Sequence, residues 1–339
     1  MNRKNVVSFL QFCFGALILW VRCSHSMEPM SIGAAIGAAS VGISYFKGQT
    51  YCRLYECCDD RSIPANVQAL EKSLQEKVYG QHIAVPNIIS ALSAHFSSRV
   101  KSRKPLVLSF HGGPGTGKSF VADQIAQALY LQGSKSEYVA KFLGRANFAQ
   151  AAHVATYKEH IDREVHKRLT NCPRSLFIFD EVEKMPSGVF DTLKALLDYN
   201  GLDDEIDNTQ AIFIFLSNNG GTHIAEHLGN RMKGGKLRED TRLSDYEPLL
   251  QKVAYSMDGG LKKTSLIESF VIDHYIPFLP LEKAHVLKCL EAEFQRWKKT
   301  PDRNIINDIL SSMTYDRIHA LFVSSGCKTL DKKVAMAIN

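Results

Sequence analysis

Short apolar runs alternate with longer amphipathic stretches through the middle of this chain. The runs of strand length cover residues 106–110, 138–142, 175–180 and 211–217. Apolar residues three or four positions apart predict helices between the runs, and also over residues 64–100, where Gly80 interrupts the pattern. Fully apolar strands that alternate with helices indicate a parallel sheet whose two faces are both covered by helices.

The pattern changes after Pro280. Residues 281–323 carry three helix-like runs and no further strand pattern, which indicates a small helical domain behind the sheet domain. We therefore predict an α/β fold, with a large domain over residues 51–280 and a small C-terminal helical domain over residues 281–339.

The first residues have the pattern of a targeting signal. Two basic residues precede a largely apolar, uncharged run over residues 6–21, and the small residues Ser24 and Ser26 follow at the spacing of a signal-peptidase site. This order predicts that residues 1–26 form a signal peptide cleaved after Ser26, and it predicts passage into the secretory pathway. An uncleaved signal anchor is the alternative interpretation.

A second, weakly apolar stretch follows directly. Residues 29–46 contain no charged side chain and are rich in Gly, Ala and Ser. As a helix, these 18 residues would measure about 27 Å, slightly less than a hydrocarbon core of about 30 Å. We predict that residues 27–50 form a monotopic membrane-associating segment. The alternative is a buried Gly- and Ala-rich helix of the soluble fold.

Composition indicates that most of the chain is soluble and globular. Hydrophobic residues make up 45% and charged residues 22% of the 339 positions, which argues against wholesale disorder and against a polytopic membrane protein. The formal net charge of +6 is small for this length, and no nucleic-acid-binding motif is visible. No nucleic-acid partner is therefore expected.

A phosphate-binding motif, G-x-x-x-x-G-K-S, follows the first apolar run, and a helical pattern follows the motif. Its glycines let backbone N–H groups turn toward phosphate oxygens, and the helix directs its positive end at them. The residues predicted to bind the nucleotide are Gly112, Gly113, Pro114, Gly115, Thr116, Gly117, Lys118 and Ser119. Lys118 would neutralise the β and γ oxygens of ATP, and Ser119 would hold Mg²⁺.

Polar residues end two of the other apolar runs. Asp180 and Glu181 follow one run, and Asn218 follows the next. An aspartate at this end of a buried strand can reach the Mg²⁺ ion, and an adjacent glutamate can polarise the attacking water, so the pair predicts hydrolysis. Asn218 would orient the water or the γ-phosphate. The alternatives are an ordinary helix charge for Glu181 and a turn-forming residue for Asn218.

These motifs, in this order, resemble the AAA+ ATPases of the Clp/HSP100 branch. A late Gly-Cys-Lys triplet at 326–328 and the segment YIPFLPL at 275–281, with FIFLSN, the leader and the weakly apolar stretch, are similar to torsins. Torsins are ATPases of the endoplasmic reticulum lumen and nuclear envelope. The resemblance implies an AAA+ large domain, and it implies that Lys328 contacts the γ-phosphate from the small domain as a catalytic group beside Glu181 and Asn218.

Six cysteines remain once the leader is removed. They are Cys52, Cys57, Cys58, Cys172, Cys289 and Cys327. Their even number makes disulfides plausible but does not choose the pairs, and a zinc site lacks a second ligand pair. The torsin resemblance implies a bond between Cys289 and Cys327, which would couple the position of Lys328 to the redox state. The alternative is two inert thiols. It also favours Cys52 as the partner of Cys172, although Cys57 or Cys58 could serve.

Two features depart from the torsin pattern. Torsins often carry Asn at the position of Ser119, so metal coordination here is the ordinary P-loop kind. The sequence also contains no N-x-[ST] acceptor, so the N-glycosylation familiar in the family cannot occur. Luminal residence is therefore predicted from the leader and the cysteines alone.

A charge is missing where Clp-type ATPases carry an arginine that reaches the γ-phosphate of a neighbouring subunit. Alignment on Pro280 places Val271 at that position, and Arg231 and Arg238 are the candidate replacements. A finger arginine contributes about 10³ to 10⁵ in rate. The chain should therefore activate itself poorly. The torsin resemblance implies a membrane-anchored activator that donates an arginine in trans.

The prediction is a Mg²⁺-dependent ATPase that remodels protein or membrane complexes and associates with itself. The loop after the second apolar run, FLGRANFAQAAHV, lacks the G-Y-V-G motif whose aromatic residue Clp rings use to grip threaded chains. Two alternatives stay open, a self-sufficient hexameric Clp-like unfoldase and an ATP-gated binding scaffold with negligible turnover.

Overall fold

The computed structural model describes residues 52, 55–97, 102–148, 150–198, 206–300, 302–316 and 320–338. The predicted signal peptide and membrane-associating segment lie outside these residues. The chain divides into two compact units, Met1–Cys57 and Cys58–Asn339. In the part of the chain that the structure describes, no helix has the length and apolar character needed to cross a membrane.

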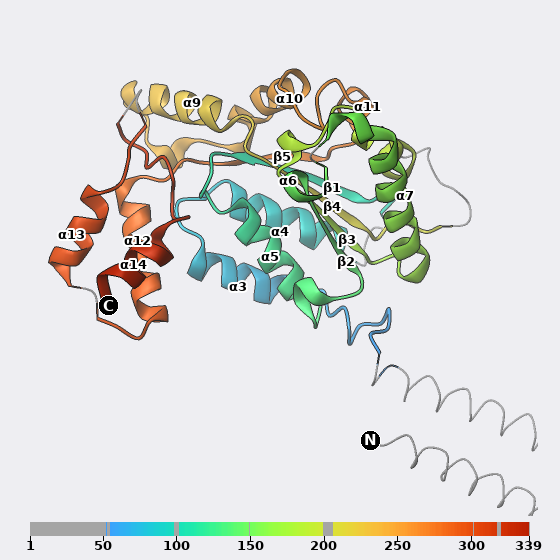
Figure 1. Cartoon of the computed structure of the whole chain (residues 1–339), viewed down its shortest axis with the longest axis horizontal. Coiled ribbons are helices and arrows are strands. Elements are labelled where there is room, and N and C mark those ends of the chain that lie inside the picture. Colours follow the sequence, from blue (N-terminus) through green and yellow to red (C-terminus); the bar gives the residue numbers. More distant parts are fainter. Residues whose placement is uncertain are drawn as a thin grey trace, which may run out of the picture. The chain divides into compact units, whose positions relative to one another are not determined.

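A five-stranded parallel sheet forms the centre of the second unit (Figure 1). The strands are β1 (Leu106–Gly112), β2 (Val139–Leu143), β3 (Leu176–Asp180), β4 (Ile212–Ser217) and β5 (His274–Phe278). They lie in the order β2-β3-β4-β1-β5, and every neighbouring pair is parallel. The predicted α/β fold is confirmed, and each of the four apolar runs is a strand.

The strand β5 was not predicted. It contains Pro277, which cannot donate a backbone hydrogen bond and therefore obscures a strand pattern. The strand lies at the edge of the sheet and pairs only with β1 among the described strands, where Pro277 faces His111. An edge position tolerates proline because one side of the strand needs no partner.

Alternation along the strands produces two apolar faces, and helices cover both. The helices on the first face are α3 (Val67–Lys77), α4 (Ala84–His95) and α5 (Lys118–Leu129). They pack on side chains such as Leu108 and Ile214. The gap between α3 and α4 contains Gly80, where the sequence pattern was interrupted.

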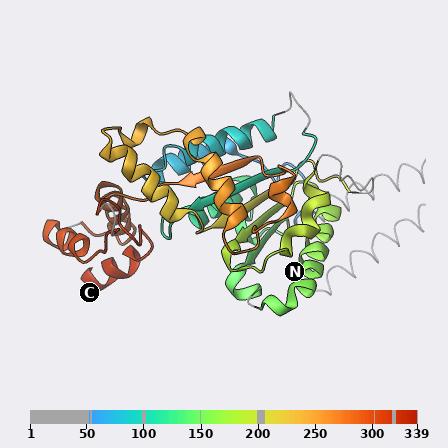
Figure 2. The same ribbon diagram turned by 90° about the horizontal axis from the view of Figure 1, so that it is seen from above.

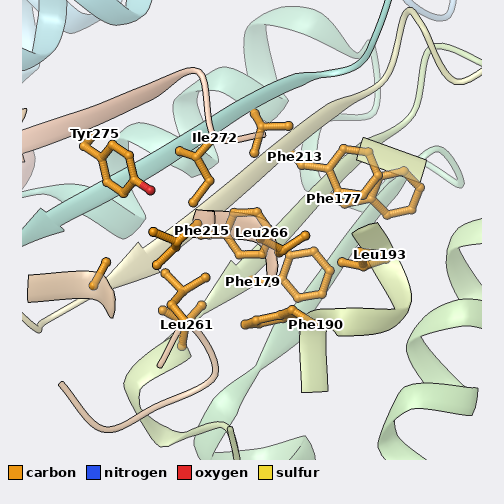
Figure 3. Close-up of a cluster of buried hydrophobic side chains, with 14 of the residues drawn as sticks. Phe177, Phe179, Phe190, Leu193, Phe213, Phe215, Leu261, Leu266, Ile272 and Tyr275 are labelled. Carbon is orange, nitrogen blue, oxygen red and sulfur yellow. The ribbon is translucent and has the colours of Figure 1, made fainter. Parts of the chain in front are cut away.

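The second face carries the largest aromatic cluster. Phe177 stacks on Phe213 and Phe179 stacks on Phe215 across neighbouring strands (Figure 3). The elements that cover or border this face are α6 (Gly144–Asn147), α7 (Val154–Asn171), α8 (Lys194–Leu197), α9 (Gly221–Lys233), α10 (Glu247–Ser256) and α11 (Ser265–Glu268). Seen from above, the orange helix α10 lies over the strands (Figure 2).

The last three helices enclose a core of their own. They are α12 (Lys283–Arg296), α13 (Arg303–Ser311) and α14 (Leu330–Ile338). The third helix was expected before residue 323, and it lies later. The chain before it instead forms two isolated antiparallel bridges, Glu282 with Phe322 and Tyr315 with Val323. The boundary at residue 281 stays a prediction.

Three disulfide bonds are formed among the described residues. Cys289 bonds to Cys327, as the resemblance implied. Cys172 bonds to Cys58 and not to Cys52, which bonds to Cys57 within the first unit. The reason lies in the segment after Cys58, whose backbone pairs with the end of α5 through Ala65 N–H to Leu129 and Leu131 N–H to Ser62. This register places Cys58 beside Cys172.

Candidate functional site

A cleft of about 940 Å³ opens where the carboxyl ends of the central strands meet the small helical domain. Its walls include all of the glycine-rich loop from Pro114 to Ser119. They also include the polar residues predicted to act there, which are Asp180, Glu181, Asn218 and Lys328. Folding therefore brings side chains from three strand ends into one cavity. Some of these residues are more than 200 positions apart in the sequence.

The glycine-rich loop depends on two left-handed glycines. Gly115 has φ 73° and Gly117 has φ 107°, values that residues with a Cβ rarely adopt. Helix α5 begins at Lys118, directly after Gly117, so its free N–H groups face the cleft. This arrangement creates a site for anionic oxygens at the positive end of a twelve-residue helix.

Lys118 is buried at the base of the loop. Its Nζ donates to the carbonyl oxygens of Gly112 and Gly113 at 2.7 and 2.9 Å and to Asn218 Oδ1 at 3.0 Å. Burial lowers the pKa of Lys118 to about 8, against the opposing charges of Glu183 and Asp180.

The two adjacent carboxylates end β3 in different environments. Asp180 Oδ1 accepts from the Glu181 N–H at 2.9 Å, and its other oxygen lies 3.9 Å from Lys141 Nζ. Glu181 has φ 56°, a left-handed conformation that costs a non-glycine residue about 1 kcal/mol or more. Its Oε1 lies 3.4 Å from the guanidinium of the exposed Arg145 on α6. The turn thus gives the two carboxylates different partners, Lys141 on β2 for one and Arg145 on α6 for the other.

Asn218 is held by Glu183 as well as by Lys118. Its Nδ2 donates to Glu183 Oε1 at 2.5 Å, and its backbone N–H donates to Glu183 Oε2 at 3.2 Å. Glu183 was not predicted as a site residue. Its signal was a third carboxylate, two positions after Glu181, in a segment that resembles ordinary charged helix sequence.

The Gly-Cys-Lys turn lies directly on the glycine-rich loop. The Cys327 N–H donates to the Gly115 carbonyl oxygen at 3.1 Å, and a Cβ on Gly326 would collide with the Gly115 backbone. Lys328 lines the cleft, and its charge contributes to the lowered pKa of Lys118. Because the Cys289–Cys327 bond joins this turn to α12, one covalent link connects the small-domain core to the turn that contacts the loop.

Val271, which the sequence predicts to occupy the position of the missing finger arginine, faces the core. The Val271 side chain is only 2% exposed and belongs to the aromatic cluster beneath α11. Both candidate replacements for the finger arginine already bind acceptors of this chain. Arg231 pairs with Asp245 at 2.8 Å, and the buried Arg238 donates to the Gly80 and Pro280 carbonyl oxygens and pairs with Glu282.

His111 is a buried histidine at the end of β1. Its Nδ1–H donates to the Asn219 carbonyl oxygen at 3.2 Å, and its Nε2 accepts from Ser109 Oγ at 2.8 Å. Burial lowers its pKa from 6.5 to about 4, so the ring is neutral at physiological pH. The ring thereby links the strand before the phosphate loop to the turn after Asn218.

This histidine predicts acid sensitivity. As pH falls from 6.5 toward 4, the unfolded chain binds a proton at His111 and the folded chain does not, so stability is lost over that window. The loss should approach about 3 kcal/mol near pH 4. His111→Gln keeps a donor and an acceptor without titrating, so urea unfolding should show a shallower acid decline. An identical decline in both proteins would contradict this assignment.

Two family models match this chain. A family model described as torsin matches residues 52–179, and a model of the torsin-1A C-terminal domain matches residues 281–336. A torsin-like protein of Drosophila melanogaster is 60% identical over 334 residues, which cover 97% of this chain and 98% of that protein. The chain belongs to the torsin family.

Further torsins agree with this assignment. A torsin-like protein of Caenorhabditis elegans is 32% identical over 94% of this chain and 92% of its own, and mouse torsin-3A is 33% identical over 84% and 75%. Among solved structures, the S. cerevisiae Hsp104–ADP complex matches 80% of this torsin with a TM-score of 0.54 at 20% identity. The torsin spans about half the length of that Hsp104 chain. The fold is that of an AAA+ ATPase, and this torsin is an ATP hydrolase.

Proposed function

We propose that this torsin is a Mg²⁺-dependent ATPase of the endoplasmic reticulum lumen and nuclear envelope that remodels protein or membrane complexes. A membrane-anchored partner would accelerate its hydrolysis by donating an arginine. One observation carries the proposal. The cleft is lined by residues 114–119, Asp180, Glu181, Asn218 and Lys328, while Val271 at the predicted finger position is uncharged and buried.

The residues in the cleft suit ATP and Mg²⁺. The Ser119 hydroxyl and the Asp180 carboxylate both line the cleft and offer the hard oxygen ligands that Mg²⁺ prefers. When bound, the ion would neutralise charge on the β and γ oxygens. Lys118 and the N–H groups at the start of α5 would bind the same phosphates, and Lys328 would contact the γ-phosphate from the small domain.

Glu181 would accept the proton of the attacking water. Its carboxylate is partly exposed in the cleft, where a water can reach it, and Arg145 lies beside it. Asn218 would align that water. Among the described residues, the arginines that line the cleft are Arg145 and Arg296. Arg145 pairs with Glu181 and Arg296 pairs with Glu293, so each already neutralises a carboxylate of this chain.

The proposed location has separate support. The leader pattern precedes the described residues, the described cysteines form disulfides, and disulfides persist in oxidising compartments. Residues 27–50 would hold the mature chain on the membrane, and a membrane-anchored activator would then share its surface. Self-association is expected because AAA+ proteins generally act as assemblies.

The proposal predicts slow hydrolysis alone and fast hydrolysis with a partner. The purified mature chain would be assayed before and after addition of a membrane protein captured on Glu181→Gln in the presence of ATP. Acceleration should reach about 10³-fold or more and should disappear when the responsible arginine of the partner is replaced. Equally fast hydrolysis alone would instead support the self-sufficient unfoldase. Negligible hydrolysis with every captured partner would support the ATP-gated scaffold.

A further inference from the structure

Glu183 binds Asn218 through two donors at once. One carboxylate oxygen accepts from the side-chain Nδ2 at 2.5 Å, and the other accepts from the backbone N–H at 3.2 Å. A carboxylate that holds both the backbone and the side chain of one residue fixes the backbone position and the side-chain rotamer together. Hydrogen bonds to a charged acceptor are also about twice as strong as neutral ones.

These contacts determine which end of the Asn218 amide faces Lys118. Glu183 is an acceptor and the Lys118 ammonium is a donor, so the amide can satisfy both only with its NH₂ toward Glu183 and its oxygen toward Lys118. The oxygen lies 3.0 Å from Lys118 Nζ. A carbonyl oxygen has two lone pairs, and the second is available to a water in the cleft.

The same short loop supports both partners. Gly259 packs against Glu183 so closely that a Cβ there would lie 2.6 Å from Glu183 Cα, and the Gly260 N–H donates to Val182 at 2.9 Å. On the other side of the pair, Asn219 Nδ2 donates to the Asp258 carbonyl oxygen at 2.8 Å. Residues 258–260 therefore hold the Glu183 turn and the Asn218 turn in fixed register.

We propose that Glu183 is a positioning residue that makes Asn218 act in ATP hydrolysis as a hydrogen-bond acceptor. Asn218 then orients the attacking water through its amide oxygen, because Glu183 holds the NH₂ end of the amide and leaves the oxygen on the side of Lys118. This inference rests on the ATPase function and chooses between the two roles that the sequence left open for Asn218.

The test exchanges the two functional groups. Glu183→Gln provides an NH₂ that pairs best with the Asn218 oxygen, which turns the amide around, and Asn218→Asp sets two carboxylates against each other. In the double variant, the new amide at position 183 donates to the new carboxylate at position 218, and an oxygen again faces Lys118. Single-turnover ATP cleavage, with protein in excess and no partner present, should fall about tenfold or more in each single variant and recover to within about threefold in the double variant.

ATP affinity separates positioning from a general loss of structure. Each variant should bind ATP within about threefold of the parent, because neither Lys118 nor any residue of the glycine-rich loop is replaced. Glu159→Gln removes the same charge from the exposed surface of α7 and should leave both quantities unchanged. A double variant no faster than the slower single variant would overturn the proposal, as would parental rates in Glu183→Gln.

A spectroscopic measurement removes the dependence on turnover. In a chain labelled with ¹⁵N-asparagine, the side-chain NH₂ signal that disappears in Asn218→Asp should shift on Glu183→Gln and stay in place on Glu159→Gln. An unmoved signal would overturn the proposal even if hydrolysis were slow. Failure of a partner to accelerate hydrolysis would refute the proposed activation alone, since these variants are compared without a partner.

Discussion

Replacement of Glu181 by glutamine is expected to lower ATP hydrolysis about 10²- to 10⁴-fold while ATP stays bound. The substitution keeps the shape of the side chain and removes the carboxylate that would take the proton of the attacking water. The phosphate contacts would come from Lys118 and the start of α5, which follow β1 and not β3 and are not altered. The Glu181→Gln variant should therefore keep ATP binding and lose ATP hydrolysis.

The measurement pairs single-turnover cleavage with equilibrium binding of ATP. Lys118→Ala provides the opposite control, because it removes the ammonium from the base of the loop and should lose the nucleotide itself. Normal cleavage by Glu181→Gln would assign the base to another carboxylate. Unchanged ATP affinity in Lys118→Ala would remove the phosphate site from the loop.

Replacement of Val271 by arginine is expected to destabilise the fold by about 3–5 kcal/mol and to leave hydrolysis slow. The Val271 side chain is 2% exposed, so the guanidinium would have to enter an apolar core. It would also approach the buried Lys104, whose ammonium donates to the Val271 carbonyl oxygen at 2.9 Å and pairs with Asp273 at 2.7 Å. A second positive charge there would repel the Lys104 ammonium.

Phe270→Arg is the matched control. Phe270 immediately precedes Val271, is 75% exposed and has φ 55°. An arginine there would stay in solvent, so the free energy of unfolding, measured with urea, should change by less than about 1 kcal/mol. A Val271→Arg chain that is as stable as the parent and hydrolyses ATP rapidly by itself would contradict the buried placement and the need for a partner.

The sequence predicts this fold and site well where local pattern and tertiary structure agree. The strands β1, β3 and β4 are buried on both faces, so they appear as continuous apolar runs, and the glycine-rich loop is one contiguous motif. The strand β5 escaped prediction because Pro277 is acceptable only at a sheet edge, and edge position is a property of the whole sheet. The third small-domain helix was misplaced because bridges at Phe322 and Val323 interrupt the helical pattern.

Other features depend on contacts that no local pattern encodes. Glu183 is important because a parallel neighbour, β4, brings Asn218 beside it from 35 positions away. The sequence predicts Val271 as the finger position, but the inward direction of its side chain follows from packing against the aromatic cluster. The cysteine partner of Cys172 was likewise decided by the backbone register of the segment after Cys58.

The Cys58–Cys172 bond also determines which strand would bear a mechanical force applied to the chain. Tension applied to the chain before Cys58 would pass through the disulfide to Cys172, four residues before β3 begins. It could not peel the following segment away from α5 one hydrogen bond at a time. The strand that receives the tension is flanked by β2 and β4, whose bonds to it would resist together in shear. Because β3 ends at Asp180, a force applied near Leu176 would be transmitted along the strand to the Asp180 carboxylate.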